Sequence, residues 1–139
     1  MHVASSVTIR VGDVSKEEEA VSGVTIKHDE ELEREYGKWV LVRRSLGVGS
    51  FGLNIVELPQ GEEIPEHDET GRDQEEVFLV LEGSPTLVVD GSEHSLRPGS
   101  FARLDPEPVR TVRNDGKTVA RVLILSAPVT SGYEPMGWA

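Results

Sequence analysis

The sequence predicts an all-β domain built as an antiparallel sandwich or barrel, preceded by a short mixed segment. From Trp39 onward, short runs rich in Val, Ile, Leu and Phe are separated by Gly, Pro and Asp-Gly turn signals, a pattern typical of antiparallel sheets. No repeat of about 20 to 50 residues is visible, which argues against a solenoid or propeller. At 139 residues and 15.2 kDa the chain is long enough for one core.

Seven strands are predicted in this body of the chain. They span residues 39–44, 50–58, 76–82, 86–90, 100–104, 109–113 and 119–126. Asp90-Gly91 is a good hairpin turn because glycine supplies the positive φ that such turns need. Four prolines, at positions 85, 98, 106 and 108, fall between the runs, where a missing N–H costs no ladder bond.

The leading segment is mixed. Residues 7–11 predict a short strand, and residues 16–20 form a charged run that we interpret as solvated. Residues 29–36 contain helix formers with acids near the start, which predicts a short surface helix closed by Gly37. We therefore expect a single domain over residues 1–139, composed of an N-terminal segment (1–45), a barrel core (46–126) and a C-terminal tail (127–139).

Charge and composition exclude several classes of function. A net charge of -11 and a pI near 4.8 disfavour nucleic acid and anionic membranes as partners, because both require cation-rich faces. The absence of cysteine excludes disulfides, thiolate catalysis and sulfur-based zinc sites. No signal peptide and no apolar run of about 18 residues is present, so a cytoplasmic location is expected.

The period of two along residues 76–82 assigns the two faces of that strand. If Glu76 points into the barrel, Phe78 and Val80 do so too, while Val77 and Leu79 point outward. Both faces are apolar, so both are expected to be covered, one by the facing sheet and the other by a partner subunit. A homodimer is the resulting prediction.

One stretch of the sequence resembles the first signature motif of the cupins. That motif runs glycine, five residues, His-X-His, three or four residues, glutamate, six residues, glycine. Gly61 to His67 and Glu76 to Gly83 keep its two outer spacings. Glu69 stands where the second histidine belongs, and six residues rather than three or four separate it from Glu76.

The resemblance continues into the second cupin motif and covers roughly residues 47–126. Gly91, the Pro98-Gly99 turn and Asn114 fit, but Arg110 stands where the family carries its last metal-binding histidine. The resemblance implies a double-stranded β-helix, or jelly-roll barrel, of the small bacterial single-domain type with a degenerate metal motif. It also implies that the position of Arg110 faces inward.

In this family a divalent ion is held by three imidazoles and one carboxylate. Carried over position by position, the resemblance leaves His67 and Glu76 as ligands, Glu69 as an oxygen substitute and Arg110 as a non-ligand, because a guanidinium has no lone pair to donate. One histidine and two carboxylates can still hold Fe, Mn, Ni or Zn as a divalent ion. A metal-dependent dioxygenase or isomerase is therefore one hypothesis.

The other hypothesis is that Arg110 takes the place of the cation. An arginine between two buried carboxylates relieves their desolvation with directional hydrogen bonds. We favour this interpretation: a metal-independent pocket, without a cofactor, that binds a small anionic or sugar-like molecule through His67, Glu69, Glu76 and Arg110, with Phe78 as a core aromatic beside them. If the protein is an isomerase, His67 and a carboxylate are its base and acid. The fold alone does not decide whether it is an enzyme.

Two further motifs receive structural interpretations. Residues 47–52 match G-x-G-x-x-G, but a strand rather than a helix follows, so no dinucleotide site is predicted. Tyr133 and Trp138 in the tail are expected to pack over a barrel end or a subunit seam.

Overall fold

The structure is a computed structural model that describes residues 6–11, 14–19 and 22–139, with side chains from residue 22 onward. It divides into two compact units, Met1–Glu31 and Leu32–Ala139. In the first unit, β1 (Ser6–Val11) and β2 (Val14–Glu19) form an antiparallel hairpin. This confirms the strand predicted at residues 7–11. Most of the charged run at 16–20 lies in β2, and its last residue lies outside the described part.

The helix predicted over residues 29–36 is wrong. Only a 3-10 turn forms (Asp29–Glu31), and β3 (Arg34–Glu35) follows it. Tyr36 and Gly37 both have positive φ, 56° and 72°, which reverses the chain into β4 (Trp39–Val40). Because β3 pairs with β4, the backbone hydrogen bonds that a helix would satisfy internally are made across this tight hairpin instead.

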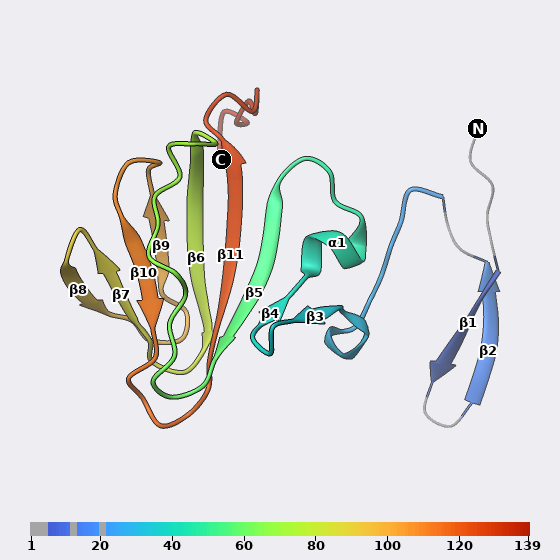
Figure 1. Cartoon of the computed structure of the whole chain (residues 1–139). Helices are drawn as coiled ribbons and strands as arrows, with labels where there is room; N and C mark the ends of the chain where they lie inside the picture. The colour runs from blue at the N-terminus through green and yellow to red at the C-terminus, as the bar shows by residue number, and fades with distance from the viewer. Residues whose placement is uncertain (1–5, 12–13, 20–21) are drawn as a thin grey trace. The chain divides into compact units, whose positions relative to one another are not determined.

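The second unit is a sandwich of two antiparallel sheets (Figure 1). A six-stranded sheet has the order β3-β4-β5-β11-β6-β9, and a three-stranded sheet has the order β10-β7-β8. The remaining elements are α1 (Val42–Leu46), β5 (Gly52–Leu58), β6 (Gln74–Glu82), β7 (Thr86–Val89), β8 (Ser92–Ser95), β9 (Phe101–Leu104), β10 (Arg110–Arg113) and β11 (Ala120–Pro128). The all-β jelly-roll prediction is confirmed.

Six of the seven predicted strands match observed strands to within two residues at each end. The prediction at 39–44 is half wrong, because the strand stops at Val40 and α1 follows, closed by Gly47 in the left-handed region. The strand β8 was not predicted, because its four residues are all exposed and polar and show no apolar alternation. It forms because Asp90 and Gly91 both have positive φ, the geometry of the hairpin turn that was predicted.

The core lies between the two sheets. Its buried apolar residues are Val56, Leu58, Ile64, Phe78, Val80, Leu87, Leu104, Val112, Ala120, Val122 and Ile124. At one end of β6 the packing is tight: a Cβ on Gly83 would lie 2.8 Å from the backbone of both Ala120 and Val119, and the φ of Gly83 is +78°. Only glycine fits there, which explains the motif glycine at this position.

Residues 61–67 widen the smaller sheet, running beside β10 (Figure 1). The N–H of Ile64 donates to the carbonyl of Val112 at 3.0 Å, and His67 and Arg110 exchange a pair of backbone bonds at 3.0 and 2.8 Å. This pairing fixes the segment that carries His67, although the segment is not a regular strand.

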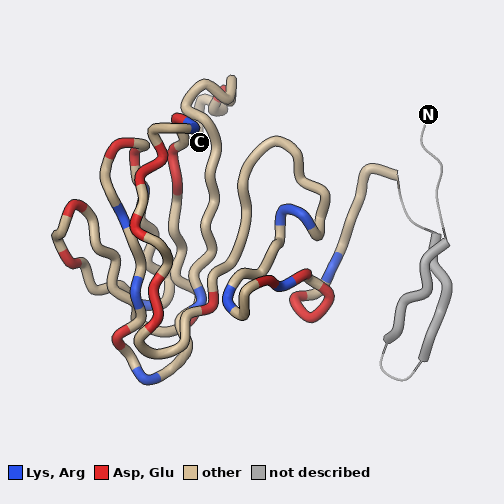
Figure 2. Tube along the Cα trace, viewed as in Figure 1, with Lys and Arg blue, Asp and Glu red and all other residues tan. Residues whose placement is uncertain are grey.

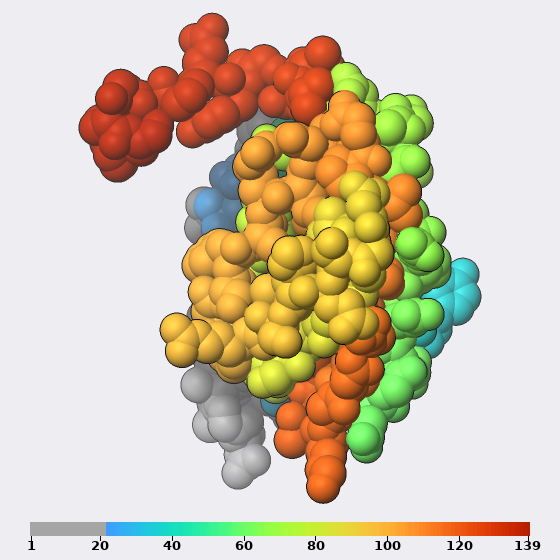
Figure 3. Space-filling model, turned by 90° about the vertical axis from the view of Figure 1, so that its left-hand side faces the viewer, coloured from blue at the N-terminus to red at the C-terminus, as the bar shows by residue number. Residues whose placement is uncertain are grey.

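The tail after β11 leaves the barrel (Figure 3). Tyr133 is 77% exposed and Trp138 is 83% exposed, so within this chain neither ring packs over the barrel end as expected. Among the described residues, no helix is both long enough and apolar enough to cross a membrane.

Candidate functional site

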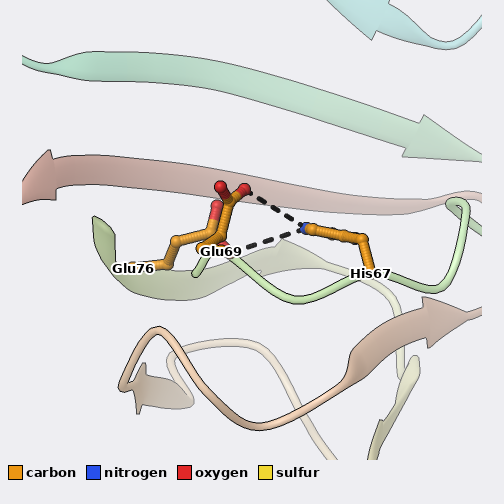
Figure 4. Close-up of side chains that lie close together, drawn as sticks. All are labelled: His67, Glu69 and Glu76. Carbon is orange, nitrogen blue, oxygen red and sulfur yellow. Dashed lines mark ion pairs between the residues drawn. The ribbon is translucent and has the colours of Figure 1, made fainter. Parts of the chain in front are cut away.

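His67 enters the site from the edge of the smaller sheet. Its Nδ1 lies 2.8 Å from the carbonyl oxygen of Pro65. Because a carbonyl can only accept, Nδ1 carries the hydrogen, and in the neutral ring the lone pair is left on Nε2. Nε2 lies 3.5 Å from a carboxylate oxygen of Glu69 and 3.7 Å from one of Glu76 (Figure 4). The imidazole is thereby held with its free nitrogen toward two acids.

Glu76 projects inward from β6, as the period of two predicted. Its neighbours on the same face, Phe78 and Val80, are also buried. The side chain of Glu76 is only 7% exposed. Burial raises the pKa of the Glu76 carboxyl and the negative charge of Glu69 raises it further, whereas Arg110 and His67 lower it.

Glu69 reaches the site despite the longer spacing to Glu76. Its backbone N–H donates to the carbonyl of Pro106 at 2.9 Å, and its side chain accepts from the amide of Gln74 at 3.2 Å. The intervening residues close on themselves, since Asp73 N–H donates to the carbonyl of Thr70 and Gln74 N–H to that of Glu69, each at 3.2 Å. The extra residues therefore form a compact turn and do not displace Glu69.

Arg110 is fully buried, in agreement with the inward position that the family resemblance implied. Its Nη1 donates to the carbonyls of Pro106 and Pro108 at 3.2 and 2.6 Å, and its Nη2 donates to that of Asp105 at 2.8 Å. Its Nε lies 3.3 Å from Oε1 of Glu76, but the alignment is too poor for a hydrogen bond, and both atoms are buried without one. The positive charge of Arg110 therefore lies next to the carboxylate of Glu76.

Arg110 also holds the other two site residues. Its backbone pairs with that of His67, and the Pro106 carbonyl that it binds is the one that accepts from Glu69. Arg110 is thus linked to His67 through its backbone, to Glu69 through the shared Pro106 carbonyl and to Glu76 through its Nε. Its terminal nitrogens point at backbone carbonyls, and Arg110 does not line the neighbouring cavity.

A cavity of about 340 Å³ opens beside these residues. Its lining residues are Trp39, Leu53, Asn54, Ile64, Pro65, His67, Glu69, Glu76, Phe78, Ile124 and Ser126. Phe78 belongs to the apolar wall, next to Ile124, which lies opposite it in the sheet. The cavity is mostly apolar, with its charged groups on one side, as small-molecule sites commonly are.

Asn54 and Ser126 line the cavity but were not predicted. Ser126 lies opposite Glu76 and Asn54 lies opposite Ile124, so both follow from the pairing register of β11 with its two neighbours. The alternation of Val122 and Ile124 could have suggested Ser126 as the next inward residue. Pairing register itself is not visible in a single sequence.

The donor set fits a divalent ion in part. One ligand atom from each of His67, Glu69 and Glu76 can be chosen so that all lie within 4.8 Å of one another. Two ligands about 2.1 Å from one ion lie roughly 3.0 to 3.4 Å apart, only slightly less than the 3.5 and 3.7 Å separations here. The unbonded Glu76 oxygen could also accept an ion. The buried guanidinium of Arg110 lies 3.3 Å from that oxygen and disfavours a metal ion there, because two positive charges repel each other.

Comparison with known proteins gives the family. The cupin-domain family model matches residues 54–126, just over half of the chain. The chain is a cupin. No curated protein sequence matches it.

Solved structures agree with this fold. A cupin protein from Bacteroides fragilis is 20% identical, with 81% of this cupin and 94% of that chain covered and a TM-score of 0.60. A structure described as a predicted oxalate decarboxylase, from Thermotoga maritima, is 15% identical, with coverages of 76% and 100% and a TM-score of 0.63. A sugar phosphate isomerase from Silicibacter pomeroyi is 24% identical, with a TM-score of 0.58.

The match to the Silicibacter pomeroyi protein covers 66% of this cupin but only 59% of that chain, less than two thirds of its length. At identities below 25% these likenesses show the fold alone, and the activities in the names belong to those proteins.

Proposed function

We propose that this cupin binds a small hydroxylated, sugar-like molecule in the cavity beside His67, Glu69 and Glu76, without a metal. The observation that carries the proposal is the placement of Arg110. A fully buried guanidinium already stands 3.3 Å from the buried oxygen of Glu76 and provides the counter-charge that a metal would otherwise supply.

The polar wall suits a ligand that donates hydrogen bonds. Ionised carboxylates only accept, and the free Nε2 of a neutral His67 accepts as well, so hydroxyl groups are the matching partners. The apolar walls, including Trp39 and Phe78, suit the C–H faces of a small ring. An anionic group is disfavoured at this wall, because Glu69 and Glu76 repel it and the terminal nitrogens of Arg110 are bonded to carbonyls.

The same groups offer proton-transfer chemistry. The Nε2 of His67 can take a proton, and Glu76 can deliver one when it is in its protonated form, which burial favours by raising the pKa of this carboxyl. Together they provide the base and the acid that an isomerase acting on a hydroxylated molecule needs.

The test is a ligand screen by thermal shift, using protein treated with EDTA and a set of neutral sugars and polyols. We expect a saturable rise in melting temperature with at least one of them, because binding to the native state stabilises it. The rise should disappear in Glu69→Gln and His67→Ala. Glu66→Gln is the matched control, since Glu66 is exposed on the same segment and does not line the cavity. A rise that survives both site variants, or that requires added metal, would contradict the proposal.

A second candidate is a metal-dependent cupin, favoured by the convergence of His67, Glu69 and Glu76. These residues would hold a divalent ion, which would act as a Lewis acid on a substrate oxygen. Calorimetric titration with Mn(II) and Zn(II) tests this candidate: stoichiometric binding in the parent protein, lost in His67→Ala, would favour it over the metal-free site.

The homodimer remains a proposal, and the outer face of the six-stranded sheet supports it. Phe101 is 73% exposed there, directly opposite Leu79 in the register of β6 and β9, and Leu123 lies on the other side of Leu79. Sedimentation equilibrium should give a dimer that Phe101→Glu weakens. The cytoplasmic location stays a prediction.

A further inference from the structure

A second hollow, of about 390 Å³, adjoins the acidic cavity. The two share Asn54 and Ser126 as lining residues. The second hollow is bounded by the loop between α1 and β5, and its charged side chains are Arg43 and Arg72. The cavity presents carboxylates, whereas among the described residues the charged groups that line this hollow are both cations.

Arg43 lines this hollow and is hydrogen-bonded to the loop that follows α1. Its Nη1 donates to the carbonyl of Val48 at 3.0 Å, which holds the side chain against the loop. Its neighbour Arg44 approaches Glu33 and Glu35 at 3.8 and 3.6 Å. No such acid lies beside Arg43 within the described residues. Figure 2 marks the basic residues of α1 in blue.

Arg72 comes from the compact turn that lengthens the spacing between Glu69 and Glu76. The cupin motif to which the sequence is similar has three or four residues there, and this chain has six. The additional length carries Arg72 to the rim of the hollow. Arg72 is exposed and forms no ion pair with any described residue, although the chain has a net charge of -11. The departure from the motif thus introduces a cation beside the cavity.

The backbone of the loop adds donors. Gly49 and Ser50 line the hollow, and within the described part of the chain their N–H groups donate to no backbone carbonyl. Two free N–H groups and two arginines around one hollow are the groups that bind multi-oxygen anions, because charge-assisted hydrogen bonds to such anions are stronger than neutral ones. The hollow therefore brings together the kinds of donor that a single anionic group requires.

We propose that this hollow is an anion subsite that holds the phosphate or carboxylate of the molecule whose hydroxylated part lies in the cavity. The placement of the hydroxylated part in the cavity rests on the proposed function, whereas the anion subsite itself does not. The anionic group predicted from the sequence to lie on Arg110 is assigned here to Arg43 and Arg72. The ligand is then an acidic sugar derivative with its hydroxyls toward Glu69 and its anion toward Arg72.

The first experiment uses inorganic phosphate and acetate as separate ligands in amide-resolved NMR titrations of the full chain at constant ionic strength. We expect phosphate to shift the amides of Gly49 and Ser50. Arg43→Gln and Arg72→Gln should each weaken phosphate binding about fivefold or more, the loss of one charge-assisted contact. Arg44→Gln is the matched control and should leave the affinity unchanged, because Arg44 does not line the hollow. Acetate shows whether a carboxylate is accepted as well.

The second experiment compares whichever neutral sugar binds in the cavity with its phosphorylated and carboxylated counterparts. The subsite predicts tighter binding of at least one charged form, and the gain should vanish in Arg72→Gln while binding of the neutral sugar persists. The subsite would be overturned if phosphate bound with the same affinity in Arg43→Gln and Arg72→Gln as in the parent protein. It would also be overturned if no charged form bound more tightly than the neutral sugar. If phosphate binds as predicted but no sugar does, the subsite stands and the cavity proposal fails.

Discussion

Along the β6–β11 strand pair, side chains alternate between inward and outward positions over the whole length. The inward side chains are apolar at one end and polar at the other. At one end Val80 and Val122 lie opposite each other and are buried, and a Cβ on Gly83 would lie 2.8 Å from the backbone of Ala120. At the other end, the inward positions of the same two strands are Glu76 and Ser126, and a cavity lies beside them. The barrel thus uses one end of a strand pair for stability and the other for a site.

The buried charges at the polar end are tolerated because each has a partner of opposite charge or a hydrogen-bond acceptor. Glu76 would be an isolated buried carboxylate without Arg110, and Arg110 would be an isolated buried guanidinium without the three loop carbonyls. The apolar end needs no such support. Substitutions at one end should therefore leave the other end unchanged.

The largest effect is expected from Arg110→Met. It leaves Glu76 buried without a counter-charge and removes the donor to the carbonyls of Asp105 and Pro108, so the free energy of unfolding should fall by about 3–5 kcal/mol. Chemical denaturation measures this loss. Adding Glu76→Gln should recover part of it, and the exposed Arg97→Met should change stability by no more than about 0.5 kcal/mol. Equal losses with and without Glu76→Gln would mean that the charge pair is not the cause.

Gly83→Ala tests the packed end. A Cβ there would meet backbone atoms at 2.8 Å at a φ of +78°, so we expect a loss of about 2–4 kcal/mol. Gly71→Ala is the matched control, because a Cβ at Gly71 meets no atom within 4 Å. Thermal unfolding of the two variants should differ clearly, while ligand binding in the cavity stays unchanged in both.

The pH dependence of stability should carry the signature of Glu76. Its folded pKa is raised, chiefly by burial, so the folded state holds this proton more tightly than the unfolded state does. This stabilisation is fully present below the unfolded pKa, near the ordinary glutamate value of 4.5, and is lost as pH rises through the folded pKa. Relative to Glu76→Gln, the parent protein should therefore lose stability over that window, at no more than about 1.4 kcal/mol per pH unit. A difference that is flat or opposite in sign would refute this.

A smaller effect is expected from Glu69→Gln. The charge of Glu69 is the second cause of the raised pKa of Glu76, so removing it should lower that pKa. NMR titration of the Glu76 carboxyl carbon measures the change. Asp68→Asn is the control, since Asp68 is exposed on the same loop and does not contribute to the shift.

The sequence predicted much of the packed end and only part of the polar end. Strand positions and the inward direction of Glu76 and Phe78 follow from periodicity, which is local. The family resemblance brought His67 and Glu76 together and left the place of Glu69 open, and the structure places all three side chains near one another. The direction of the Arg110 guanidinium could not be predicted, because it depends on where the carbonyls of residues 105–108 lie, and these belong to an irregular loop.

The helix expected at residues 29–36 failed for a related reason. Local propensity favoured it, but the positive φ of Tyr36 and Gly37 folds the segment into a hairpin whose far strand pairs with β5. The arginine hollow was also beyond the sequence, since Arg43 and Arg72 are brought together only by the fold.

The central claim is that Arg110 supplies the positive charge of this site and thereby replaces a metal. Elemental analysis of the parent protein and of Arg110→His, both purified without an affinity tag, tests it most directly. We expect the parent protein to hold far less than one equivalent of Fe, Mn, Ni or Zn, and the histidine variant to gain metal. Nearly one equivalent in the parent protein, lost in His67→Ala, would contradict the account.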